Sequence, residues 1–464
     1  MAFWNKIFGW LQRGASAEAQ RGPDRAELLE RRRARQAAID ARSAEPTPVS
    51  PIDGDSSFPS FRSQALERGE ASRFNKARLT LRDVFTPAQP VTERSKFAGR
   101  LAVLARLIEI LEDQRSHVVI YGERGIGKTS LVHILADIAR ESRYLVVYAS
   151  CGAFSSFEDI FRTVLREIPQ LYLRDIDPTE LGEHQGSLAD RLAADVDARG
   201  LGELLAQVTG TRVIIILDEY DRAESDQFRQ SVAELIKNLS DRAARVQLVL
   251  AGVASNLQQL VGYIPSIRRN VIGLPMPRLS SEEVRSLIRI GERSAGVEFD
   301  AEAIVTIETL SNGSPYLVRL VSHHASMHAL DAERMRIELT DVWAALDKVV
   351  DESAGRIDPR LIAAVEPALE GSRRPITHAA ARAASTPDGW FAPEDALSLC
   401  DNCSPERMAK ELNEMTLAGV LERAAEGETA RYRFREEPLP TYLWMRIARD
   451  QAGAGRPDAR TATA

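Results

Sequence analysis

The residues best suited to chemistry form one glycine-rich stretch near position 125. It runs Gly122, Glu123, Arg124, Gly125, Ile126, Gly127, Lys128, Thr129 and Ser130. Glycines let the backbone wrap so that its N–H groups face phosphates. Lys128 then places a positive charge on the β and γ oxygens, and the Thr129 hydroxyl binds Mg²⁺. The pattern therefore predicts a nucleoside triphosphate site in which these nine residues hold the phosphates.

An acidic pair supplies the remaining chemistry. The apolar run 213–217 ends in Asp218 and Glu219. Such a run is typical of a strand buried on both faces of a parallel sheet. We expect Asp218 to hold Mg²⁺ through its water shell, and Glu219 to orient and deprotonate the attacking water. A core strand followed by an exposed acidic turn is the structural alternative, and the nearby phosphate loop favours catalysis.

A parallel sheet would bring the two motifs together. Four apolar runs have the length of strands: residues 117–121, 144–148, 213–217 and 246–251. These runs alternate with helical patterns such as 157–168. This alternation predicts an α/β fold, a doubly wound parallel sheet of the P-loop NTPase type, over residues 84–275.

Two helical regions follow the predicted sheet. Residues 276–353 contain four helical patterns, the first opened by a capping box of Ser280 and Glu283, and they predict an all-helical lid. Residues 354–450 contain three more helical patterns and then a β-hairpin, which together predict a winged-helix domain. The composition of residues 451–464 predicts a disordered tail.

The N-terminal segment, residues 1–83, has a different character. A helix over residues 1–13 would place five apolar residues on one side: Phe3, Trp4, Ile7, Phe8 and Leu11. This face could bind a membrane surface, a groove of a partner protein, or the protein's own body. A basic helical patch around 31–35 and a disordered linker over 45–61 complete the segment.

Composition limits the remaining classes. No apolar run reaches the length of a membrane span, no signal-peptide pattern is present, and three cysteines fit a reducing compartment. We expect a cytoplasmic protein, with peripheral membrane attachment through residues 1–13 as an alternative. Residues 1–100 carry 18 Lys and Arg against 12 Asp and Glu, whereas the rest carries 42 against 55. Nonspecific binding of nucleic acid by the main body is therefore not expected.

The order of these motifs resembles a known family over residues 84–450: the AAA+ ATPases of the origin-recognition type and their bacterial STAND-like relatives. The segment Phe97-Ala98-Gly99-Arg100 is similar to the motif before the family's adenine pocket. Ser255 stands at the sensor 1 position, where the family usually has Asn. Arg268 and Arg269 stand in the segment that carries the arginine finger.

The resemblance implies an ATP or ADP site with Mg²⁺, and a finger that acts in trans within an ATP-dependent homo-oligomer. The stretch Gly313-Ser314-Pro315 is similar to the G-x-P of STAND switches, which implies slow turnover with ADP held by the lid. Arg319 is a candidate substitute for the family's sensor 2 arginine.

Two functions remain open. The first is a slowly hydrolysing regulatory ATPase that acts as a nucleotide-dependent switch toward an unidentified protein effector. The second is a DNA-binding initiator or a transposition-type regulator that uses the winged helix. The candidate recognition helix, 405–414, has three acidic and two basic residues, which favours the switch. Arg431, Arg433 and Arg435 on the wing favour DNA.

Overall fold

The computed structural model describes most of the chain after residue 72. The described residues are 73–174, 186–192, 196–262, 267, 269–401, 403–426 and 429–455. The predictions for residues 1–13, the basic patch and the linker fall outside them, as does Arg268. Among the described residues, no helix combines the length and the hydrophobicity needed to cross a membrane.

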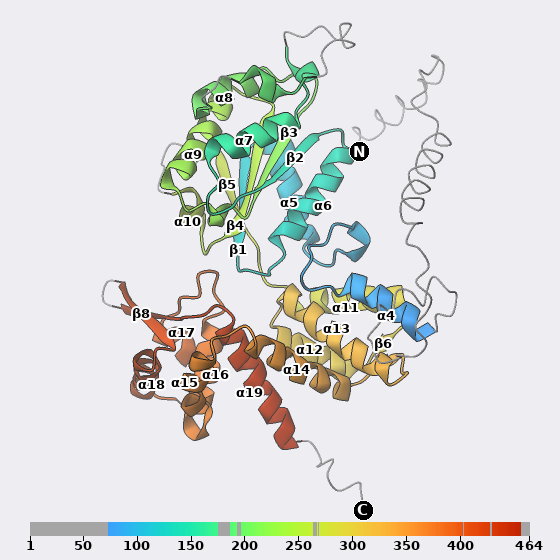
Figure 1. The fold of residues 1–464 in the computed structure, drawn as a ribbon, viewed down its shortest axis with the longest axis vertical. Helices are drawn as coiled ribbons and strands as arrows, with labels where there is room; N and C mark the ends of the chain where they lie inside the picture. The colour runs from blue at the N-terminus through green and yellow to red at the C-terminus, as the bar shows by residue number, and fades with distance from the viewer. Residues whose placement is uncertain are drawn as a thin grey trace, which may run out of the picture. The chain divides into compact units, whose positions relative to one another are not determined.

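A parallel sheet of five strands forms the first domain (Figure 1). The strands are β1 (His117–Gly122), β2 (Leu145–Ser150), β3 (Val213–Asp218), β4 (Val246–Val253) and β5 (Val271–Pro275), in the order β2-β3-β4-β1-β5. This is the α/β class that the sequence predicts, and four strands fall where it predicts them. Strand β5 was not predicted, because Gly273 and Pro275 interrupt its short apolar run.

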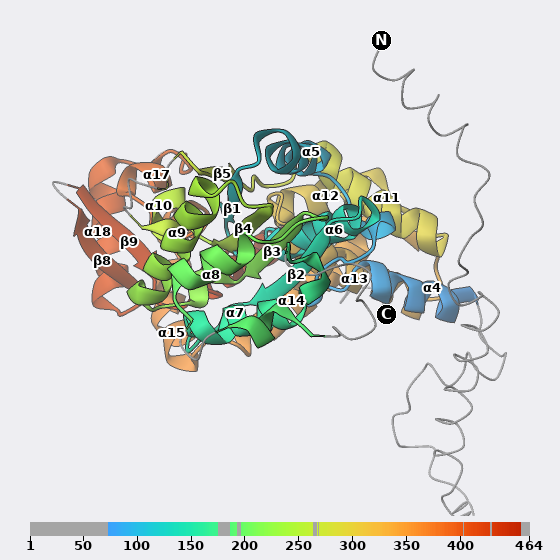
Figure 2. The ribbon, with the colours of Figure 1, turned by 90° about the horizontal axis from the view of Figure 1, so that it is seen from above.

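Alternate residues of each strand face opposite sides of this sheet. Val118, Ile120 and Ile214 pack against helices α5 (Leu101–Glu109) and α6 (Lys128–Glu141). Val119 and Ile215 pack on the other side with helices α7 (Phe157–Arg166), α8 (Ala198–Leu205) and α9 (Asp226–Asp241). Figure 2 shows the strands between α5 and the pair α8 and α9. A further helix, α10 (Leu257–Val261), follows β4.

A second group of helices, here called the helical domain, follows β5. It contains α11 (Ser281–Ala295), α12 (Ala301–Ser311), α13 (Pro315–Asp331) and α14 (Leu339–Ala354), in agreement with the four predicted helices. Ser280 caps α11 and Glu283 completes the predicted capping box. The domain also contains two paired strands of two residues each, β6 (Glu298–Phe299) and β7 (Arg336–Ile337), so it is not wholly helical.

Helix α4 (Arg73–Val84) lies within the segment predicted to precede the folded domains, and it packs on α11 and α13. Leu81 and Phe85 are fully buried in the core of the helical domain. Gly291 of α11 makes room for the Phe85 ring, since a Cβ atom there would lie 2.2 Å from its Cζ. The helical domain therefore contains residues that precede the sheet in the sequence as well as residues that follow it.

The C-terminal domain contains five helices and a hairpin within the described residues. They are α15 (Pro359–Val365), α16 (Arg374–Ala383), α17 (Pro393–Leu397), α18 (Pro405–Leu417), β8 (Leu421–Glu426), β9 (Thr429–Phe434) and α19 (Leu439–Gly455). Helices α17 and α19 were not predicted. Helix α19 extends five residues into the predicted disordered tail, because buried Tyr442, Leu443 and Ile447 anchor the helix that these residues continue.

Candidate nucleotide-binding site

The glycine-rich loop connects β1 to α6 in the strand-loop-helix arrangement that the sequence predicts. Gly125 and Gly127 have φ angles of 71° and 94°, in the left-handed region that favours glycine. Helix α6 begins at Lys128, so its free N–H groups point into the loop. Gly125 also permits close contact with the helical domain, since a Cβ atom there would lie 3.3 Å from the Cβ of Tyr316.

A cavity of about 370 Å³ lies over this loop. Four parts of the chain line it: the loop, the carboxyl ends of β3 and β4, the segment before α5, and the helical domain. The lining includes Arg124 to Ser130, Asp218, Glu219, Asp221, Arg222, Gly252, Val253, Pro87 to Val91, Phe97, Ala98, Arg100, Leu279, Leu287, Pro315, Tyr316 and Arg319. This volume is within the range of small-molecule sites.

Most of the predicted site residues meet at this cavity. They are Arg100, Arg124, Gly125, Ile126, Gly127, Lys128, Thr129, Ser130, Asp218, Glu219 and Pro315. The lining does not include Gly122, Glu123, Ser255 or Arg269. Ser255 instead donates its backbone N–H to the side chain of Gln259 in α10, and Arg269 is exposed.

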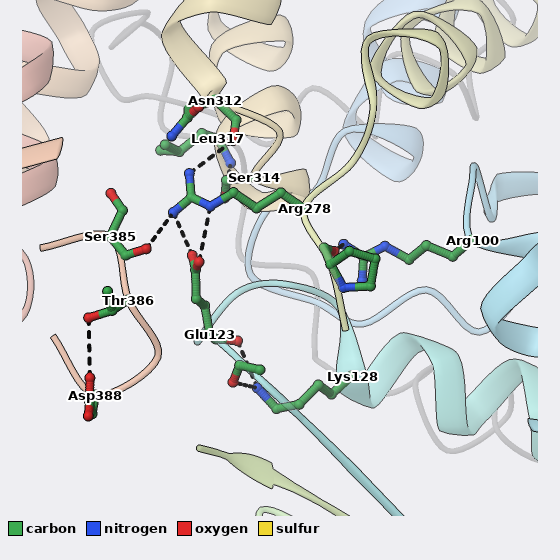
Figure 3. Close-up of polar contacts among 12 residues, drawn as sticks. Arg100, Glu123, Lys128, Arg278, Asn312, Ser314, Leu317, Ser385, Thr386 and Asp388 are labelled. Carbon is green, nitrogen blue, oxygen red and sulfur yellow. Dashed lines mark hydrogen bonds and ion pairs between the residues drawn. The ribbon is translucent and has the colours of Figure 1, made fainter. Parts of the chain in front are cut away.

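Lys128 lies folded against its own loop. Its Nζ donates to the carbonyl oxygens of Gly122 at 2.9 Å and Glu123 at 2.7 Å (Figure 3). The residue is only 8% exposed. Burial lowers the pKa of Lys128 to about 8, although Asp221 and Asp218 act in the opposite direction. An anion with several oxygens would stabilise the charged form of this amine.

Asp218 is a buried carboxylate, 2% exposed, with fixed orientation. One oxygen accepts from the Tyr148 hydroxyl at 2.9 Å, and the other accepts from the Glu219 N–H at 2.8 Å. Burial, together with the charge of Asp218, raises the pKa of Tyr148, which remains a hydrogen-bond donor. The Asp218 carboxylate and the Thr129 hydroxyl line the same cavity. Oxygen donors of this kind fit Mg²⁺, which retains several waters in such sites.

Glu219 has a left-handed backbone, with φ of 52°. Its carboxylate accepts from the Ser150 hydroxyl at 3.1 Å and pairs with Arg222 at 2.8 Å. The first contact ties the carboxylate to the end of β2, and the second ties it to the turn that follows β3. In this conformation Arg222 and Ser150 compete with a water molecule for the same oxygen.

Two arginines add positive charge: Arg100 is buried and Arg319 is half-buried. Arg100 donates to the Pro277 carbonyl at 2.9 Å and its backbone N–H donates to Glu283. Arg319 donates weakly to the Lys96 carbonyl at 3.4 Å. Within the described part of the chain, the Nε atoms of both arginines lack an acceptor. Burial lowers the pKa of each to about 10, so both remain charged at neutral pH, which suits an anionic ligand.

The sequence analysis did not predict several residues that contribute to this site. Ser150 and Tyr148 lie at the end of β2, and side chains at the carboxyl ends of parallel strands meet at one edge of the sheet, so this position could have indicated them. Arg222 follows Glu219 by three residues. The segment Pro87–Val91 carries no motif, and its Val91 N–H donates to the Ser130 hydroxyl at 3.0 Å.

Two side chains of the loop bind other domains. Glu123 forms a bidentate pair with Arg278, with N–O distances of 3.0 and 2.5 Å. Arg278 also donates to the carbonyls of Asn312 at 2.9 Å and Ser385 at 3.5 Å, as Figure 3 shows. Arg124 pairs with Glu437 at 2.8 Å. The phosphate loop is thus connected to both the helical and the C-terminal domains.

Residues 96–250 match the family model of the AAA ATPase domain. No curated protein matches the chain.

Among solved structures, the chain is similar to the ORC1 protein of Aeropyrum pernix in complex with DNA, with 15% identity over 81% of this chain and 97% of that one, at a TM-score of 0.43. It is also similar to the RuvB Holliday junction branch migration motor of Thermotoga maritima, with 16% identity over 77% and 96% and a TM-score of 0.40. Cdc6p from Pyrobaculum aerophilum has 15% identity over 80% and 98%, at a TM-score of 0.42.

Proposed function

We propose that this protein is an ATP-binding and slowly hydrolysing AAA+ ATPase that acts as a nucleotide-dependent switch toward a protein effector. One observation carries the proposal: a single cavity collects the phosphate loop, the Asp218 and Glu219 pair, and residues of the helical domain. A ligand that contacts both domains can change their relative position, which is the basis of a nucleotide switch.

In this proposal the loop N–H groups and Lys128 hold the β and γ phosphates of ATP. Thr129 and Asp218 would hold Mg²⁺, which would supply positive charge to the phosphate oxygens. Glu219 leaves Arg222 and Ser150 and accepts a proton from the attacking water. Because both contacts must break first, slow turnover is expected.

The helical domain serves as the lid in this scheme. Pro315 and Tyr316 lie at the start of α13, and Arg319 follows one turn later in the same cavity wall. A role of Arg319 at the nucleotide phosphates is supported by its place in the cavity wall and by its Nε, which lacks an acceptor in the described structure. The lid would hold ADP after hydrolysis and release it slowly.

A finger in trans, supplied by Arg268 or Arg269, is the reason to expect an ATP-dependent homo-oligomer. The exposure of Arg269 supports this role, because a residue that acts on a neighbouring subunit has to be accessible. The cytoplasmic location and the use of residues 1–13 for a partner or a membrane remain predictions.

The C-terminal domain, which we interpret as a winged helix, is less suited to DNA. Lys410 of α18 pairs with Glu414 at 3.9 Å, and Arg407 donates to the Ser372 carbonyl at 2.9 Å. On the wing, Arg433 pairs with Glu422 at 2.6 Å. These internal partners reduce the charge that could neutralise DNA phosphates, so binding of a protein effector is favoured over the DNA-binding alternative.

Affinity capture with the Glu219→Gln protein tests this proposal. This variant, loaded with ATP, should retain an effector protein that the ADP-loaded protein and the Lys128→Ala protein do not retain. Fluorescence anisotropy with duplex DNA is the parallel measurement. ATP-dependent binding of DNA, with no ATP-dependent protein partner, would replace the switch with the DNA-binding alternative.

A further inference from the structure

A second cavity lies between the helical domain and the C-terminal domain. Its volume is about 500 Å³. Its walls come from the start of α11 and the end of α12 on one side, and from α16 and α19 on the other. A volume of this size accommodates a small organic ligand.

The charge of this cavity favours an anion. Arg278, His378 and Arg382 line it. Glu308 is the one acidic side chain among the described lining residues, and it already pairs with Arg285 at 3.1 Å. Burial lowers the pKa of His378, and the charges of Arg382 and Arg374 lower it further, which is the effect of a positive environment.

Arg382 has the chemistry of an anion-binding residue. Its guanidinium lies over the Trp444 ring at 5.3 Å from the ring centre, so packing fixes its orientation. Its Nε is buried and has no hydrogen-bond partner within the described part of the chain. A buried donor without an acceptor costs free energy, so this guanidinium has hydrogen-bonding capacity that the described residues do not use.

The remaining lining is suited to a flat apolar group. The Trp444 indole lies in the wall, and the His378 ring meets it edge to face at 6.0 Å. Leu279, Leu310 and Ala448 extend the apolar surface. An anionic group and an aromatic group in one ligand of this size are the features of a mononucleotide.

We propose that this cavity is a second ligand site, which binds a phosphorylated molecule of mononucleotide size through Arg382, with its flat portion near Trp444. The site is separate from the nucleotide cavity over the phosphate loop. Arg278 connects the two, because it lines this cavity and its guanidinium pairs with Glu123 of the loop.

Calorimetry on the full-length protein tests the proposal. The protein is first saturated at the phosphate loop with one equivalent of a nonhydrolysable ATP analogue, without an excess that could fill the second cavity, and then titrated with AMP and, separately, with inorganic pyrophosphate. At least one probe should bind. Arg382→Gln should weaken that binding at least about tenfold, as expected for loss of a hydrogen bond to a charged group. AMP that binds more tightly than pyrophosphate identifies the nucleoside portion as part of the ligand, and Trp444→Leu should then weaken AMP alone.

Two further variants complete the test. Arg289→Gln, at an exposed position of α11 that does not line the cavity, makes the same charge change and should bind as the wild type does. Ala448→Met fills the cavity from the α19 wall without altering Arg382, so it should also weaken binding, even if Arg382→Gln fails to fold. Failure of both probes to bind the saturated wild-type protein would overturn the proposal. Wild-type affinity in either Arg382→Gln or Ala448→Met would overturn it as well.

Discussion

The two halves of the phosphate loop have different surroundings. The second half, Gly125 to Thr129, lines the nucleotide cavity and is built from glycines, a lysine and a hydroxyl. In the first half, the Glu123 side chain extends away from Lys128 to Arg278, and Arg124, which also lines the cavity, pairs with Glu437 of the C-terminal domain. One half therefore has the chemistry to bind a ligand, and the other connects that ligand's site to the domains that would respond. The comparison shows how a short loop can combine binding with communication between domains.

The largest expected effect separates the two halves directly. Lys128→Ala should weaken ATP binding at least about 100-fold, because the phosphate charge then loses its nearest cation. Glu123→Gln should leave ATP affinity within about threefold, since that side chain does not line the cavity. Isothermal calorimetry measures both. Equal losses in the two variants would remove the distinction.

The pKa of Lys128 predicts a pH dependence of ATP binding. Burial lowers that pKa to about 8 in the free protein, and bound phosphates would raise it again. Binding then takes up a proton above pH 8, so the ATP dissociation constant should increase about tenfold from pH 7 to pH 9. Arg100 and Arg319, with pKa values of about 10, should stay mostly charged over this range. A dissociation constant that is the same at both pH values would contradict the assigned role of Lys128.

A smaller effect concerns Glu219. Arg222→Ala should raise ATP turnover up to about fivefold, because it removes an exposed ion pair worth up to about 1 kcal/mol that holds the carboxylate away from water. Ser150→Ala removes the second contact and should act in the same direction. Steady-state phosphate release measures both variants. A fall in turnover would mean that these partners position Glu219 for catalysis and do not restrain it.

The smallest expected effects concern the two ion pairs formed by the first half of the phosphate loop. Loss of the Glu123 and Arg278 pair, which is partly buried and bidentate, should lower the melting temperature by several degrees. Loss of the exposed Arg124 and Glu437 pair through Arg124→Ala should change it by less than about 2 °C. Thermal unfolding of Arg278→Gln, Glu123→Gln and the double variant checks the first pair, and the double variant should add little to either single change.

The sequence was most informative where chemistry requires adjacent residues. The loop from Gly122 to Thr129 and the pair Asp218 and Glu219 each place their predicted chemistry in a short run, and these runs supply Arg124 to Thr129, Asp218 and Glu219 of the cavity lining. Helix α11 was predictable for the same reason, because Ser280 and Glu283 form a local capping box.

Features that depend on distant contacts were not predictable. Glu123 and Arg278 are 155 positions apart, and their pairing requires the helical domain to pack against the loop. Helix α4 has a polar sequence and gains its stability from Leu81 and Phe85 in the core of another domain. Helix α19 extends into a segment rich in Gly and Ala because its apolar residues are buried earlier in the helix.

Single-turnover hydrolysis by the wild-type and Glu219→Gln proteins tests the central claim most directly, because it separates ATP binding from catalysis in the same cavity. We predict that Glu219→Gln binds ATP within about threefold of the wild type and hydrolyses it at least about 100-fold more slowly, as expected when a general base is removed. Equal rates of hydrolysis in the two proteins would show that Glu219 is not the base and would contradict the proposed site.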